Sequence, residues 1–144
     1  MVRLATHDDI QDIVRLAIES VSNDPLPLTI SRRKMRKQAE ECIEQKCIWV
    51  SEIDGKVVGV VAGVIHDSFW FTESQMTLLM MYCPTGGEGY KLLRCFAQRA
   101  QSDDIGMAYV SLERHMDNRY IKAFQRLGFN RPSPAMIWTR SSYE

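Results

Sequence analysis

Apolar residues in the first part of the chain recur every three to four positions, the period of an amphipathic helix. The recurring positions are Ile10, Ile13, Val14, Ala17, Ile18 and Val21. A short apolar segment at 2–5 precedes them, and Thr6 is a favoured capping residue, so we expect a strand followed by a helix. A second helix is expected from Ser31, another capping residue, to about Lys46.

The middle of the chain has the pattern of a β-hairpin. Two segments rich in valine and isoleucine, 48–53 and 56–65, flank Asp54-Gly55, a two-residue turn signal. The second segment is apolar at nearly every position, which indicates a strand covered on both faces.

Strands and helices alternate in the second half. We expect strands at 73–82, 107–112 and 135–139, and helices that follow the first two of them. The apolar face of the first of these helices consists of Leu92, Leu93, Phe96, Ala97 and Ala100. The order of elements predicts a single domain over residues 1–144, of the α/β (α+β) class, with a mixed sheet and helices on both faces.

A glycine-rich turn joins the strand at 73–82 to its helix. Its sequence is Pro84-Thr85-Gly86-Gly87-Glu88-Gly89. Backbone N–H groups in such a turn, together with the partial positive charge of the helix start, suit a phosphate or pyrophosphate. The alternative is a flexible turn that only begins a helix, because short glycine motifs give many false positives.

Composition limits the partners and the compartment. Eighteen basic and eighteen acidic residues cancel, so no overall field attracts nucleic acid or an anionic membrane. The longest apolar run, 57–65, is too short to span a bilayer, and the N-terminus lacks the apolar core of a signal peptide. Four cysteines and three histidines show no metal-site spacing, so we expect no metal and the reduced, buried thiols of a cytoplasmic protein.

The second predicted helix begins with a run of cations. They are Arg32, Arg33, Lys34, Arg36 and Lys37. One interpretation is a basic lip for an acidic ligand. The other is a solvated face on which Arg36 pairs with Glu40 and Lys37 with Glu41.

The order of elements and three motifs resemble the Gcn5-related N-acetyltransferases, the GNAT family, over residues 2–139. In the strand, turn and helix of 78–100, Gly87 and Gly89 fall on the small positions of the family's turn. The segments RYIKAFQRLGF and VRLATHDDIQDIVRLA are similar to the family's penultimate helix and its opening. The short turn looks most like those of small acetyltransferase-like proteins of tailed bacteriophages. Pro84 departs from the family's Gln or Arg, and Phe124 from a tyrosine that protonates the leaving thiolate in many members.

The resemblance implies a mostly antiparallel sheet of about six to seven strands, with acetyl-CoA as co-substrate. The pyrophosphate would lie on N–H groups of Gly86, Gly87, Glu88, Gly89, Tyr90 and Lys91. The pantetheine arm would run along Leu79, Met80 and Met81, where a backbone N–H polarises the thioester carbonyl. Asn118 would contact the other side of the arm, or simply cap its helix.

Acetyl transfer needs an unprotonated amine, so a base must be present. The candidates are Glu73, His66 and Glu113, and each is alternatively a solvated surface residue. Tyr120, one helical turn before Phe124, either replaces the missing tyrosine as general acid or is a core aromatic.

Two functions follow from the resemblance. One is an N-acetyltransferase that acts by direct attack, within a ternary complex, on a primary amine of a small molecule or a protein. The other is a catalytically impaired scaffold that binds a partner protein. The acceptor is expected near 22–33 and near 66–72, which contains Phe69, Trp70 and Phe71. An exposed final strand would permit a homodimer.

Overall fold

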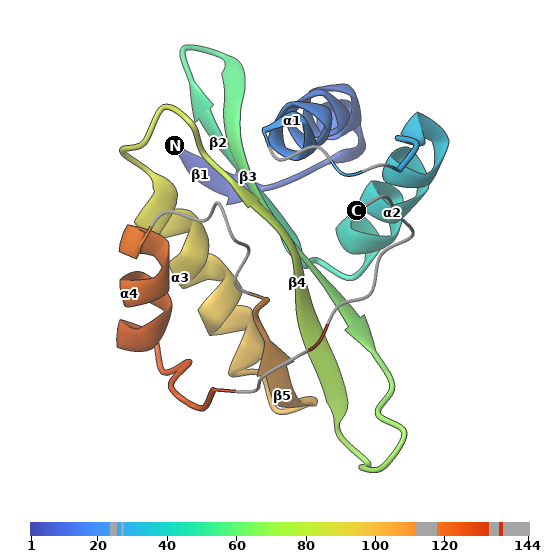
Figure 1. Ribbon diagram of the computed structural model, residues 1–144, viewed down its shortest axis with the longest axis vertical. Coiled ribbons are helices and arrows are strands. Elements are labelled where there is room, and N and C mark those ends of the chain that lie inside the picture. The colour runs from blue at the N-terminus through green and yellow to red at the C-terminus, as the bar shows by residue number, and fades with distance from the viewer. Residues whose placement is uncertain (24–25, 27, 112–117, 133–135, 137–144) are drawn as a thin grey trace, which may run out of the picture.

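The computed structural model describes residues 1–23, 26, 28–111, 118–132 and 136 (Figure 1). In chain order the elements are β1 (Val2–Leu4), the 3-10 helix η1 (His7–Asp9), α1 (Ile10–Ser22), α2 (Arg32–Glu44), β2 (Ile48–Ile53), β3 (Lys56–His66), β4 (Ser74–Tyr82), α3 (Gly89–Ala100), β5 (Ile105–Tyr109) and α4 (Asn118–Arg126). Apart from Met136, the strand predicted at 135–139 lies outside the described residues, as does the candidate base Glu113.

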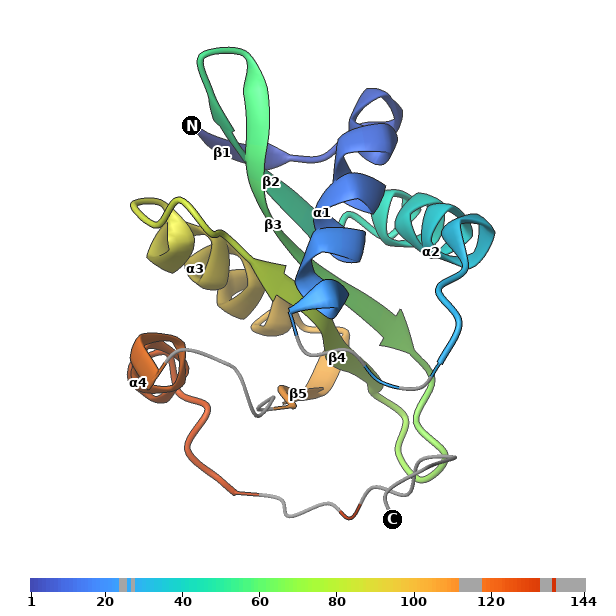
Figure 2. The ribbon, with the colours of Figure 1, turned by 45° about the horizontal axis from the view of Figure 1, so that its top comes forward.

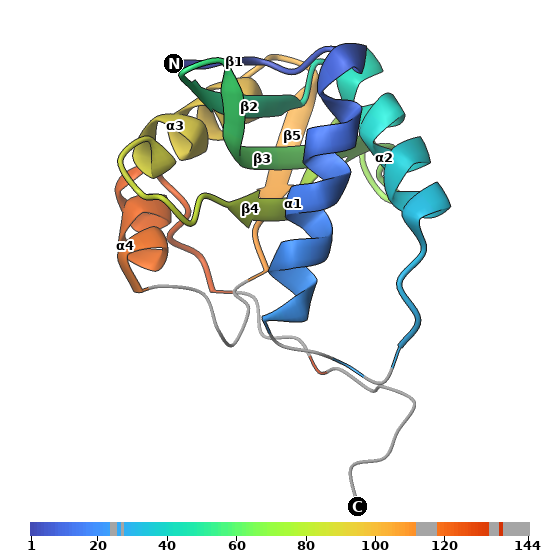
Figure 3. The same ribbon diagram turned by 90° about the horizontal axis from the view of Figure 1, so that it is seen from above.

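One sheet organises the domain. Within the described residues it has five strands in the order β1-β2-β3-β4-β5. The first four are antiparallel neighbours, and β4 and β5 run parallel. The mixed, mostly antiparallel sheet is confirmed, with fewer strands in this part of the chain than the six to seven expected. Figure 3 shows α1 and α2 on one face and α3 and α4 on the other, which confirms helices on both faces.

The sheet separates two hydrophobic cores. Val60 packs into the core under α1 and α2, and Val61 packs into the core under α3 and α4. This alternation explains why β3 is apolar at nearly every position. Gly63 allows α3 to approach closely, because a Cβ atom there would lie 2.7 Å from Cε2 of Phe96.

β4 contains a β-bulge at Leu79. Leu78 lies opposite Gly63 and Met80 opposite Ala62, so Leu79 is an extra residue. The bulge reverses the side-chain alternation: Leu78 packs into the α3–α4 core, whereas Met80 packs against the α1–α2 core. Pairing with β5 involves only Ser74 to Thr77, before the bulge.

A partly buried ion pair fixes the start of α1. The two terminal nitrogens of Arg3 donate to the carboxylate of Asp9 at 2.8 and 3.0 Å, and the N–H of Thr6 donates to it at 2.8 Å. Asp9 is only 5% exposed, and the Arg3 guanidinium holds the pKa of its carboxyl below the usual range. The acidic partner predicted for the Thr6 cap is therefore also the anchor that ties α1 to β1.

We expect Arg3→Met to lower the free energy of unfolding by about 2 kcal/mol at neutral pH, because the buried carboxylate of Asp9 then keeps only its hydrogen bonds from Thr6. A carboxyl whose pKa is lower in the folded than in the unfolded state stabilises above its unfolded pKa, and this contribution is lost as pH falls through the folded pKa. The difference between wild type and variant should therefore shrink below about pH 4. Urea unfolding at several pH values measures it.

Arg99→Met is the matched control, since Arg99 pairs at 3.4 Å with the exposed carboxylate of Asp104. Arg99→Met should lower the free energy of unfolding by less than about 1 kcal/mol. Equal losses in the two variants would contradict a special role for the Arg3 pair.

Candidate functional site

A cavity of about 510 Å³ extends from the gap between α1 and α2, past β4, to the start of α4. Apolar side chains of α1 and α2 form one wall. β4 and the residue after it form the floor through Leu78, Leu79, Met80, Met81, Tyr82 and Cys83. The far end is lined by Pro84, Gly86, Ser111, Arg119 and Tyr120. The cavity therefore joins both faces of the sheet around one strand.

The floor of the cavity is a strand with a free edge. After Thr77, β4 has no partner on the β5 side in the part of the chain that is described. An extended ligand can pair with such an edge as an added strand. Leu79, Met80 and Met81, the residues expected to bind the pantetheine arm, all lie on this floor, and Leu79 is 41% exposed.

The glycine turn requires glycine at two positions. Gly86 and Gly87 have φ values of +68° and +73°, which other residues rarely adopt. A Cβ atom on either would meet no atom within 4 Å, so the turn is open on that side. This open space fits a ligand that approaches the backbone closely.

Fewer turn N–H groups are available than expected. The N–H of Gly86 donates to the carbonyl of Cys83 at 3.1 Å, and that of Glu88 donates to the carbonyl of Gly86 at 2.8 Å. These two predicted donors are held within the turn itself. The N–H groups left without an acceptor in the described chain are those of Gly87, Gly89, Tyr90 and Lys91. They lie at the N-terminus of α3, where an anion is favoured.

The Glu88 carboxylate in the turn is held by partners outside the turn, which compensate its charge. Oε1 of Glu88 accepts from Oγ of Ser51 at 2.7 Å and from the Met1 ammonium at 2.8 Å. These contacts lower the pKa of Glu88 to about 2. Nζ of Lys91 lies 3.6 Å from the other oxygen. The turn can therefore carry a glutamate without presenting an uncompensated negative charge to an anion.

Tyr120 packs across the start of α3. Its hydroxyl donates to the carbonyl of Cys83 at 3.4 Å, and a Cβ on Gly89 would lie 3.1 Å from its ring. The close approach of the Tyr120 ring therefore explains why residue 89 is a glycine. Tyr120 lines the cavity as a candidate acid should, whereas Asn118 is exposed at the first position of α4 and is not among the lining residues.

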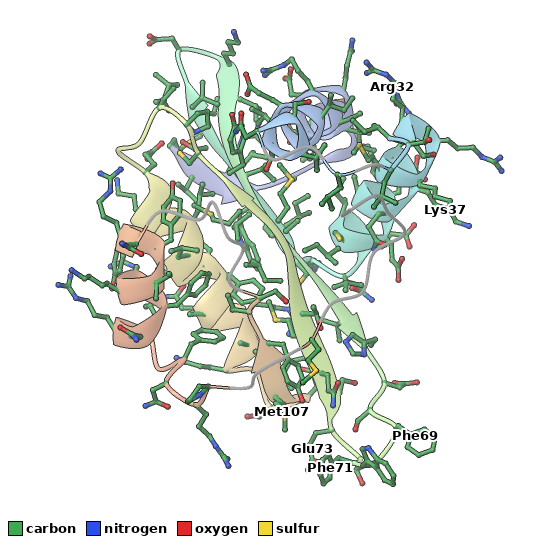
Figure 4. The ribbon with its side chains drawn as sticks, in the orientation of Figure 1. Arg32, Lys37, Phe69, Phe71, Glu73 and Met107 are labelled. Atoms are coloured by element: carbon green, nitrogen blue, oxygen red, sulfur yellow. The ribbon has the colours of Figure 1, made fainter. Side chains whose placement is uncertain are left out.

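The predicted bases Glu73 and His66 lie outside this cavity. Glu73 precedes β4 (Figure 4). This end of β4 lies opposite the end that leads through the glycine turn into α3 (Figure 2). His66 ends β3, and its Nε2 lies 3.0 Å from Oγ1 of Thr77. Phe69 and Phe71 lie at the same end as Glu73, so the 66–72 segment does not reach the cavity either.

The basic run of α2 does not line the cavity. Its five cations are exposed, and Arg32 and Lys37 point outward (Figure 4). None of the five forms an ion pair with another described residue, so the suggested pairs with Glu40 and Glu41 are absent there. The run is a solvated face.

The cysteines are free thiols, as expected. Burial raises the pKa of Cys42 to about 11 and of Cys47 to about 12, and it also raises the pKa of Cys83 beside the turn. A thiol of raised pKa is a poor nucleophile. In the described part of the chain, no three potential metal ligands gather at one point, and no helix has the length and apolar character needed to cross a bilayer.

Sequence reasoning missed several lining residues, of which Tyr82 is the clearest. Tyr82 lines the cavity and packs toward α1 and α2, and its hydroxyl has no hydrogen-bond partner among the described residues. Arg119, Ser111 and Gln38 also line the cavity. The side on which Tyr82 lies depends on the bulge, for which the apolar sequence of β4 has no signal.

No family model and no curated protein matches the chain. Solved structures do. A predicted acetyltransferase from Clostridium acetobutylicum, solved with acetyl-CoA, has a TM-score of 0.73 at 14% identity, over 96% of this chain and 95% of the other. An aminoglycoside acetyltransferase from an uncultured soil sample, in complex with sisomicin, has a TM-score of 0.69 at 12% identity, over 99% of this chain and 96% of the other. A ribosomal-protein-alanine N-acetyltransferase from Brucella melitensis has a TM-score of 0.69 at 18% identity, over 89% of this chain and 83% of the other. The chain thus has the acetyltransferase fold that its resemblance to the GNAT family predicted.

Proposed function

We propose that the protein transfers an acetyl group from acetyl-CoA to a primary amine by direct attack within a ternary complex. The carrying observation is that the free edge of β4 and Gly86 of the open glycine turn line one cavity, and that this turn leads directly into α3. Proteins of the same fold include one solved with acetyl-CoA, one named for a small-molecule acceptor and one named for a protein acceptor.

The residues present fit this co-substrate. The N–H groups of Gly87, Gly89, Tyr90 and Lys91 would hold the pyrophosphate. The backbone of Leu79, Met80 and Met81 would pair with the pantetheine arm, and an N–H of this edge would stabilise negative charge on the carbonyl oxygen. Acetyl-CoA supplies an activated acyl carbon as a thioester.

Acetyl transfer requires the cavity to support two proton movements. The acceptor nitrogen forms a bond to the acyl carbon, the carbon–sulfur bond breaks, and the departing thiolate takes up a proton while the nitrogen loses one. Tyr120 lies at the turn end of the cavity and is the proposed proton donor, and Tyr82 is a second hydroxyl on the acceptor side. Cys83, buried and of raised pKa, forms no acyl intermediate.

A second candidate, a scaffold that binds a partner without catalysis, is favoured by Phe124. Its ring is buried against Phe129, with 5.5 Å between ring centroids, where many GNAT members carry the acid tyrosine. Turnover distinguishes the two candidates.

The turn can be tested by thermal unfolding with acetyl-CoA. At about one hundred times its dissociation constant the ligand should add roughly 2.7 kcal/mol, a rise in Tm of roughly 5–10 °C. We expect Gly87→Glu to abolish this rise, because its carboxylate would meet the pyrophosphate. Gly55→Glu is the matched control: Gly55 has a φ of +77° and equally open surroundings, but lies in the β2–β3 hairpin. A rise retained by Gly87→Glu would refute the proposed site.

Tyr120→Phe tests the acid. The ring contact with Gly89 is kept and the hydroxyl is lost, so kcat should fall by about 100-fold, with little change in the KM for acetyl-CoA. Glu73→Gln, outside the cavity, should leave kcat within about twofold. Equal losses in both variants would assign the chemistry elsewhere. A normal acetyl-CoA shift without turnover on any amine would favour the scaffold.

A further inference from the structure

The acceptor side of the cavity, between α1 and α2, has apolar walls. α1 contributes Ile13, Val14 and Ala17, and α2 contributes Met35 and Ala39. The sheet closes this space with Ala62 and Met80. A molecule that fits here gains chiefly by burying apolar surface.

The charges of these helices lie elsewhere. Asp12 pairs with Arg15 at 3.5 Å outside the cavity, and Glu19 and Glu40 are exposed. Among the described lining residues, the charged side chain is that of Arg119, which comes from α4 at the other end. A cationic acceptor would therefore lose its hydration beside α1 and α2 without a compensating carboxylate from the described lining residues, which is costly.

We propose that the acceptor is an apolar aromatic amine that binds uncharged between α1 and α2, an inference that rests on the proposed function. An aromatic amine is unprotonated at neutral pH, so it needs no base before its nitrogen attacks, whereas an alkylammonium must first lose a proton. The proton lost on acyl transfer passes to the departing thiolate, and no further reactant is required.

The polar side chains that line this region are those of Ser20, Asn23, Gln38 and Tyr82, a set small enough to suit a single amine. The Nε2 group of Gln38 donates to Glu41 at 3.2 Å, which leaves its amide oxygen without a donor in the described chain. The hydroxyl of Tyr82 is also without a partner there. Few oriented polar groups in an apolar pocket are typical of small-molecule sites. The described lining lacks the carboxylates that would compensate a polycation such as an aminoglycoside.

The test compares 4-ethylaniline with its isomer 4-methylbenzylamine and with kanamycin. The isomers match in size, but only the benzylamine is cationic at pH 7. We expect kcat/KM for 4-ethylaniline to exceed that for the benzylamine by about tenfold at pH 7 and to vary little with pH, while the benzylamine rate rises with pH. As a binding readout, 4-ethylaniline should raise the Tm of the protein loaded with coenzyme A, and kanamycin should not.

A variant with a charge in the apolar wall of the acceptor side tests where the acceptor binds. Ala17→Asp puts a carboxylate on the acceptor side, so the preference for 4-ethylaniline should fall by about tenfold. Gln11→Asp adds the same charge on the exposed face of α1 and should leave the preference unchanged. The acetyl-CoA thermal shift, retained in both variants, confirms an intact fold and turn.

Faster turnover of kanamycin or the benzylamine at pH 7 would overturn this inference and leave the proposed function standing. An unchanged preference in Ala17→Asp would overturn the placement of the acceptor between the helices. Turnover of none of the three amines would also overturn the inference. The acetyl-CoA shift then shows whether the cofactor site has failed with it.

Discussion

The extra residue at Leu79 is the constraint on which the site depends. In a regular strand, Met80 would lie on the same face as Leu78; with the bulge it lies on the opposite one. Pairing with β5 ends just before it, at Thr77, so backbone groups of β4 have no partner on this side in the described chain and are open to a ligand. Unpaired groups of a strand cost free energy unless something bonds to them. A co-substrate that pairs with this edge converts the cost into binding energy.

Two separate cores hold the walls of the cavity while its floor stays open. α3 is fixed against the sheet by the close contact of Phe96 with Gly63. α1 is fixed by the partly buried pair of Arg3 and Asp9. Neither contact lies in the cavity, and several lining side chains are themselves buried in the core under α1 and α2, so the apolar wall is held rigid. Preorganised walls reduce the entropy lost when a ligand binds.

Local signals in the sequence predicted most of the fold. The left-handed backbone of Asp54 and Gly55, with φ of 51° and 77°, forms the predicted hairpin, and Oγ of Ser31 caps α2. These features depend on neighbours in sequence. The bulge has no such local signal, because it inserts one apolar residue into an apolar strand. The sequence therefore does not reveal on which face of the sheet Tyr82 lies. The candidate bases Glu73 and His66 lie outside the cavity, because β4 is long enough to keep its two ends apart.

Two departures from the GNAT pattern count less against the proposed acetyl transfer than the sequence alone indicates. Phe124 is only 2% exposed, in the α3–α4 core, whereas Tyr120, one turn earlier on the same helix, lines the cavity. Pro84 lacks an N–H group, but four others at the start of α3 have no acceptor in the described chain. What the described cavity lacks is a carboxylate or imidazole to deprotonate an ammonium. An acceptor that arrives neutral removes that requirement, so the apolar wall and the lack of a base among the described lining residues lead to the same class of substrate.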